Sequence, residues 1–120
     1  AITVLRGKAI LKFTFQMTDD EKRETKEAQT ALFHKVCAFC RDQKPDLVVC
    51  DELIGASALG LVPEEEIRRF LQEKPEKTEV VLTGRDPSPE LIDLADYVSE
   101  IKKIKHPFDK GIPARLGIEE

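Results

Sequence analysis

Two neighbouring carboxylates, Asp51 and Glu52, directly follow the apolar run Leu47–Cys50. A carboxylate at the end of a buried strand is typical of a Walker B element, where it holds Mg²⁺ directly or through water beside nucleotide phosphates. Acidic residues also follow strands simply because loops are wet, so this short pattern leaves a structural explanation open. Neighbouring strand residues point to opposite faces, which favours one metal ligand with a structural partner over a general acid–base pair.

A second polar segment, Thr83, Gly84 and Arg85, follows the predicted buried strand Glu79–Leu82. Glycine permits a close backbone approach, and the guanidinium group binds phosphate or carboxylate. A turn with a surface arginine explains this segment equally simply when it is taken alone. Ligands of parallel sheets bind beyond the carboxyl ends of the strands. The presence of polar segments after both strands therefore predicts a site at that edge.

Three cysteines and a histidine form a pattern that could suggest metal binding. His34, Cys37 and Cys40 recur every three residues, but a helix would place the first and last about 120° apart around its axis. A structural zinc site needs four ligands, and Cys50 lies in a predicted strand. We expect these thiols to pack in the core, with a metal or thiol-redox site as the alternative.

Two further groups of side chains have no single interpretation. Phe13 and Phe15 alternate in an irregular segment before the first predicted helix, where they could fill the core or flank a flat ligand. The C-terminal segment is locally basic, and this suits either an anionic ligand such as a polyphosphate or a solvated strand edge. Its basic residues are Lys102, Lys103, Lys105, His106, Lys110 and Arg115.

Helical periodicity and cap signals predict three helices. At Thr18 the letters TDDE form a capping box, and helical spacing continues to about Asp42. The apolar face of this helix is predicted as Ala28, Leu32, Val36, Phe39 and Cys40. Pro63 opens a second helix, which Lys74-Pro75 ends and whose inner residues are Ile67, Phe70 and Leu71. Ser88 caps a short third helix.

Four strands are predicted between and beside these helices: an edge strand at 2–5, Leu47–Cys50, Glu79–Leu82 and a last strand at 97–101. The continuous apolar runs of the middle two indicate strands buried on both faces. Segments 7–18 and 105–120 are expected to be irregular. The alternation predicts an α/β fold with a mostly parallel sheet and helices on both faces.

Length and composition fit one domain over residues 1–120. The chain is 41% hydrophobic and carries 19 Lys+Arg against 23 Asp+Glu, for a net charge of −4. This acidity argues against general binding to nucleic acid or anionic membranes. No apolar run approaches the roughly 18–20 residues that span a bilayer. Three cysteines without an export signal lead us to expect free thiols in a reducing cytoplasm.

Taken together, these segments resemble the ATP:corrinoid (cob(I)alamin) adenosyltransferases of the P-loop type. The resemblance covers nearly the whole chain from residue 13 onward, and residues 80–112 are its most specific part. The matching segments are FTFQMTDDEK (13–22), DLVVCDEL (46–53), GLVPEEEI (60–67), VVLTGRDPSPELIDLADYVSEIKKIKHPFDKGI (80–112) and ARLGIEE (114–120).

The resemblance implies a RecA-like P-loop fold and transfer of the 5′-deoxyadenosyl group of ATP to the cobalt of a reduced corrinoid. Glu52 matches the family's magnesium-binding carboxylate, with Asp51 beside it. Phe13 and Phe15 match an aromatic pair that closes over the lower face of the corrinoid, although the second is often Trp. A homodimer and a flavodoxin-like reductant are partners implied by the resemblance alone.

The loop Thr83, Gly84 and Arg85 matches a segment near the nucleotide in that family. The family's GxxxxGK[ST] loop has no counterpart here, because Gly7-Lys8 lacks the second glycine and the hydroxyl residue. We therefore expect the 120 residues to be the C-terminal part of a longer transferase, with a fold that is incomplete at the N-terminus. The alternative is a non-catalytic corrinoid- or nucleotide-binding module without a P-loop.

Overall fold

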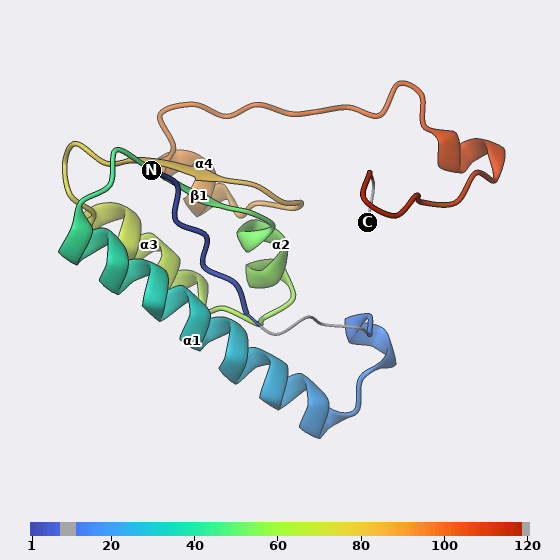
Figure 1. The fold of residues 1–120 in the computed structure, drawn as a ribbon, viewed down its shortest axis with the longest axis horizontal. Coiled ribbons are helices and arrows are strands. Elements are labelled where there is room, and N and C mark those ends of the chain that lie inside the picture. Colours follow the sequence, from blue (N-terminus) through green and yellow to red (C-terminus); the bar gives the residue numbers. More distant parts are fainter. Residues whose placement is uncertain (8–11, 119–120) are drawn as a thin grey trace.

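The computed structural model describes residues 1–7 and 12–118 (Figure 1). Helices and strands alternate in its central part, as the sequence predicts. Their order is η1 (Thr14–Gln16), α1 (Asp19–Gln43), β1 (Leu47–Cys50), α2 (Leu53–Ala58), α3 (Glu64–Glu73), β2 (Glu79–Leu82), α4 (Pro89–Leu94) and η2 (Pro107–Lys110). None of the helices within residues 1–7 and 12–118 has the length and apolarity needed to cross a membrane.

The long helix α1 begins at the capping box that the sequence predicts. The Thr18 hydroxyl accepts a hydrogen bond from the Glu21 N–H at 3.2 Å, and the Glu21 carboxylate accepts one from the Thr18 N–H at 2.8 Å. Hydrogen bonding from Lys12 keeps the pKa of Glu21 below its ordinary value. The helix ends at Lys44, which adopts the left-handed conformation with φ 45°. Both ends are therefore determined locally.

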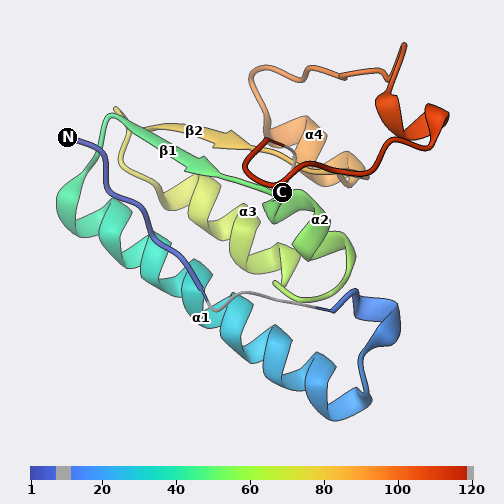
Figure 2. The same cartoon turned by 45° about the vertical axis from the view of Figure 1, so that its right-hand side comes forward.

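The sheet consists of the two parallel strands β1 and β2, whose register pairs Leu47 with Glu79 and Cys50 with Leu82. Figure 2 shows α1 and α3 on the same side of these strands. Parallel strands require a crossover connection, and α2 and α3 supply it between β1 and β2. The α/β class and the parallel pairing are thus confirmed.

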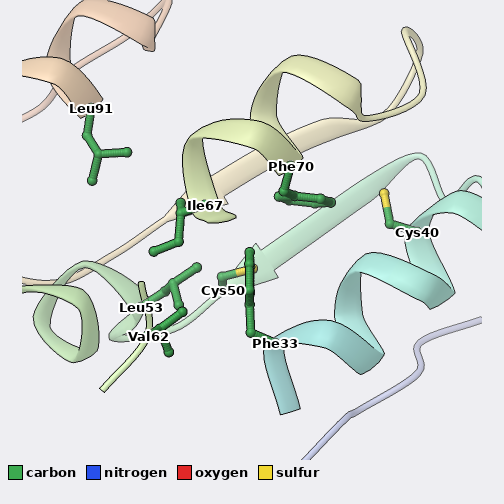
Figure 3. Packing of buried hydrophobic residues seen from close by; sticks show 8 residues of the cluster. All are labelled: Phe33, Cys40, Cys50, Leu53, Val62, Ile67, Phe70 and Leu91. Carbon is green, nitrogen blue, oxygen red and sulfur yellow. The ribbon is translucent and has the colours of Figure 1, made fainter. Parts of the chain in front are cut away.

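The core lies between the sheet and helices α1, α2, α3 and α4 (Figure 3). Phe33 of α1 and Phe70 of α3 pack edge to face, with ring centroids 5.7 Å apart and planes at 84°. The inner positions predicted for α3 are confirmed, since Ile67 is fully buried. On α1 the prediction included Ala28, which is exposed, and missed Phe33, which is 3% exposed.

The opposite face of the sheet is open, which corrects the prediction of helices on both faces. Leu47, Val49 and Val81 are 55%, 58% and 44% exposed. Successive strand residues alternate between faces, so Val48, Cys50 and their β2 neighbours are the strand residues that pack on the core. Within the described residues, no element covers the other side.

Two predicted strands are wrong. Residues 2–5 and 97–101 form no strand, and Tyr97 and Ile101 are 94% and 97% exposed. Their β-prone side chains favour extended backbone, but a strand also needs a neighbour to pair with. In the described part of the chain β2 pairs with β1 alone. Segment 105–118 is irregular as expected, apart from η2, while residues 8–11 and 119–120 lie outside the described part.

The cysteines pack in or against the core, as expected. Cys40 and Cys50 are 0% and 9% exposed, and all three thiols are free. Burial raises the pKa of Cys50 to about 11 from the ordinary value of 9.0. Burial, and then the proximity of Cys50, raises the pKa of Cys37 to about 11 as well. Such thiols are weak nucleophiles near neutral pH, which argues against the thiol-redox alternative.

We predict that thiolate absorbance of the folded chain rises near pH 11 for Cys37 and Cys50, and near pH 9 after unfolding in urea. Because the unfolded chain loses these protons first, the free energy of unfolding falls as the pH increases from about 9 to about 11. A Tyr97→Phe background removes the overlapping signal of the chain's single tyrosine. A full thiolate step near pH 9 in the folded chain would contradict the burial.

Candidate functional site

The polar segments after β1 and β2 meet at the carboxyl ends of the two strands. Because Cys50 pairs with Leu82, the next residues, Asp51 and Thr83, come to lie beside each other. The Thr83 N–H donates to the Cys50 carbonyl at 3.2 Å, which extends the strand pairing by one step. The sequence predicts this meeting of the two segments, and the structure confirms it.

Hydrogen bonds of Thr83 join the two segments. Its hydroxyl donates to Asp51 Oδ1 at 2.8 Å and accepts from the Glu52 N–H at 2.9 Å. Its carbonyl accepts from the N–H of Ile54, the second residue of α2, at 3.1 Å. Thr83 therefore holds the turn between β1 and α2 through both its side chain and its backbone.

Glu52 occupies a strained backbone position at the start of α2. Its φ is 55°, in the left-handed region that few residues other than glycine adopt. Its Oε2 lies 3.1 Å from the point where a Cβ on Gly55 would stand, so the carboxylate bends back over the first turn of α2. Asp51 and Glu52 are both exposed. Strain of this kind is concentrated at functional sites.

Gly84 packs against the amino-terminal end of α2. Its φ is 139°, and an added Cβ would stand 2.6 Å from the Gly55 nitrogen and 2.8 Å from Ile54 Cβ. Glycine at this position therefore allows the close approach of Ile54 and Gly55 of the same chain, rather than of a ligand. Arg85 follows in an exposed position.

The aromatic pair Phe13 and Phe15 is exposed but lies far from the carboxylates at the strand ends. Phe13 and Phe15 stack with centroids 5.4 Å apart and planes within 9°, and they are 70% and 79% exposed. Figures 1 and 2 place η1 near the amino-terminal end of α1, away from the carboxyl ends of the strands. The pair therefore does not fill the core of the described residues, which was one of its two predicted uses.

A cleft of about 430 Å³ lies between α1 and α3. His34 Nε2 and Glu66 Oε2 bridge the two helices at 2.5 Å, and Phe33 and Phe70 contribute apolar walls. The cleft does not include Asp51, Glu52 or the loop after β2. In the basic C-terminal segment, Lys103 forms an ion pair with Asp109 at 2.7 Å. Part of the positive charge of this segment is therefore compensated within the chain.

The donors at the strand ends suit a magnesium ion that is shared with phosphates. Mg²⁺ is usually bound by one or two carboxylates, with water and phosphate oxygens as its other ligands. Asp51 and Glu52 provide two exposed carboxylates, of which Asp51 is fixed by Thr83. Within residues 1–7 and 12–118, no group of three or more His, Cys, Asp and Glu side chains could hold a metal ion. Asp51 and Glu52 match the number of carboxylates that a magnesium ion shared with phosphates takes from a protein.

Comparison with known proteins gives one consistent result. The model of the family "ATP:corrinoid adenosyltransferase BtuR/CobO/CobP" matches residues 2–119. A corrinoid adenosyltransferase of Sinorhizobium sp is 41% identical over 108 residues, which are 89% of this chain and 50% of that protein. Corrinoid adenosyltransferase CobA of Salmonella typhimurium and a corrinoid adenosyltransferase of Escherichia coli K12 are 42% and 35% identical over 100 residues. These two alignments cover 80% of this chain and 51% of each relative.

We predict that Gly84→Ala lowers the free energy of unfolding by about 3 kcal/mol, because it adds a steric clash to an unfavourable φ. Gly60→Ala is the matched control, since Gly60 has φ 72° but open space around its Cβ position. That variant should lose only about 1–2 kcal/mol. Urea unfolding followed by circular dichroism measures both. Equal losses would mean that the contact between Gly84 and α2 contributes nothing.

Proposed function

Because the chain belongs to the ATP:corrinoid adenosyltransferase family, we propose that it provides the carboxylate-bearing part of an enzyme that transfers the 5′-deoxyadenosyl group of ATP to cobalt in a reduced corrinoid. The observation that carries this proposal is the pair Asp51 and Glu52, anchored by Thr83 at the carboxyl ends of two parallel strands. This is where α/β proteins bind nucleotides.

We propose that the active enzyme is longer than these 120 residues and has a RecA-like fold. The chain spans about half the length of the curated relatives it matches. Parallel sheets are almost always covered on both faces, whereas Leu47, Val49 and Val81 leave one face here exposed. Further strands, helices and a phosphate-binding loop from the rest of the protein would cover this face and hold the triphosphate.

At the carboxylate site, Glu52 is the proposed magnesium ligand and Asp51 its neighbour, with residues 83–85 near the nucleotide. When bound, Mg²⁺ would offset the charge of the triphosphate leaving group and orient it. The role of Glu52 in this scheme is to hold the metal–triphosphate complex at the edge of the sheet. Arg85, in an exposed position beyond Gly84, offers a guanidinium group to the phosphates.

The proposed reaction requires no proton transfer by a side chain. Co(I) attacks C5′ of ATP with its electron pair, the C5′–O bond breaks, and triphosphate leaves with that bond's electrons. The protein contributes binding, orientation and exclusion of water. Co(II) must first gain one electron, for which we propose a flavodoxin-like reductant in the cytoplasm and a homodimeric enzyme.

The exposed stack of Phe13 and Phe15 is proposed to lie against the lower face of the corrinoid. An apolar ring surface there would exclude water and the lower axial ligand, and the resulting four-coordinate Co(II) is easier to reduce. The stack is already formed in the chain, with near-parallel rings that are mostly exposed. A flat macrocycle is a suitable partner for such a surface.

A binding module without catalysis is the second candidate. The observation that favours it is that these 120 residues contain no GxxxxGK[ST] loop. Calorimetric titration of the 120-residue chain with MgATP and with reduced corrinoid separates the two. Corrinoid binding without ATP binding favours the module, whereas binding of neither places the activity in the longer protein. Formation of adenosylcobalamin by this chain alone would contradict the proposed need for a phosphate-binding loop.

In the complete gene product, Glu52→Gln is expected to reduce kcat/KM for MgATP about a hundredfold, because it removes a charged metal ligand while preserving shape. The corrinoid KM should not change. Glu76→Gln is the matched control, since Glu76 is exposed in the turn before β2 at the opposite end of the sheet. Unchanged magnesium dependence in Glu52→Gln would contradict the assignment of Glu52.

For the aromatic pair, Phe15→Ala is expected to abolish the electron paramagnetic resonance signal of four-coordinate Co(II) in the enzyme's ATP complex. Phe15→Trp should retain that signal, because a larger ring still excludes the axial ligand. Phe108→Ala, which alters an exposed phenylalanine outside the stack, is the control. Retention of the signal in Phe15→Ala would assign the stack to another partner.

A further inference from the structure

We infer that Thr83 is a positioning residue of the carboxylate site: its hydroxyl fixes Asp51 and the turn at Glu52, and it does not bind the nucleotide directly. The inference rests on the proposed function only for the identity of the ligand, which is Mg²⁺ with the triphosphate of ATP. The geometry itself belongs to residues 51–54 and 83–84 of this chain.

The bonding capacity of the hydroxyl supports this role. A threonine hydroxyl has one proton to donate and two lone pairs that accept. The proton of Thr83 goes to Asp51 Oδ1 at 2.8 Å, and one lone pair accepts the Glu52 N–H at 2.9 Å. Phosphate oxygens of a nucleotide need donors. Thr83 could donate to a phosphate only by releasing Asp51.

The backbone of Thr83 fixes the hydroxyl in place. Its N–H donates to the Cys50 carbonyl at 3.2 Å, and its carbonyl accepts from the Ile54 N–H at 3.1 Å. The next residue, Gly84, packs within van der Waals contact of Gly55 and Ile54, where no side chain fits. A hydroxyl held on both sides by backbone contacts can orient a flexible carboxylate.

The turn at Glu52 needs such a support. Its left-handed backbone, with φ 55°, is unfavourable for a residue with a side chain and must be held by neighbouring contacts. The hydrogen bond from the Glu52 N–H to Thr83 is a contact of this kind. This turn directs the Glu52 carboxylate back toward Gly55, while Thr83 retains Asp51. One hydroxyl thus determines the relative placement of both carboxylates.

The test compares Thr83→Val, which removes the hydroxyl at nearly constant shape, with Thr83→Ser, which keeps it. Thr30→Val is the control, because the Thr30 hydroxyl donates a single hydrogen bond to the Leu61 carbonyl, outside the carboxylate site. The first readout is amide hydrogen exchange at Glu52 in the complete gene product without metal or substrate. We expect exchange about tenfold faster in Thr83→Val and near wild type in Thr83→Ser and Thr30→Val. Equal exchange in Thr83→Val and wild type would overturn the inference.

The second readout is Mn²⁺ binding in the presence of ATP, followed by water-proton relaxation. We expect Thr83→Val to weaken metal binding about tenfold and Thr83→Ser to restore it. If Thr83 contacts the nucleotide instead, Thr83→Val weakens ATP binding while the Glu52 amide stays protected, and the inference fails. If the wild-type protein forms no adenosylated corrinoid, the proposed function fails, yet the Glu52 amide still decides the role of Thr83.

Discussion

The parallel pairing of β1 with β2 is the constraint on which the rest of the structure depends. It brings the carboxyl ends of two strands, 32 residues apart in the chain, to one edge of the sheet. It also requires the crossover through α2 and α3, and that crossover carries Ile67 and Phe70 into the core. The site and the core are therefore two results of one strand pairing.

In the described residues, helices cover only one face of this two-stranded sheet. The helices satisfy one face of the sheet, where Phe33 and Phe70 meet, and leave Leu47, Val49 and Val81 exposed on the other. A parallel sheet with a bare apolar face is unusual, since such sheets normally lie between layers of helices. This imbalance, together with the chain's share of its relatives' length, is the physical reason for proposing that function belongs to a larger domain.

Local signals predicted most of the fold. The capping box at Thr18, the cap residue Ser88 and the prolines identified α1, α3 and α4, and the apolar runs identified β1 and β2, because these signals act over a few residues. The wrong strands at 2–5 and 97–101 had suitable side chains, but within the described residues neither segment pairs with an outer edge of the two-stranded sheet. The short helix α2 was missed because its LIGASA sequence carries no cap signal, and its start depends on the strained turn at Glu52.

The sequence by itself determined the candidate site residues, because Asp51, Glu52, Phe13 and Phe15 are recognisable by type, neighbours and resemblance to a family. Only the tertiary structure decided how they are supported. It shows that the Thr83 hydroxyl donates to Asp51 and accepts from the Glu52 N–H. It also shows that α2 packs so closely on Gly84 that no side chain fits there. Hydrogen bonds and steric contacts across the sheet join residues far apart in the chain, and no local pattern contains that information.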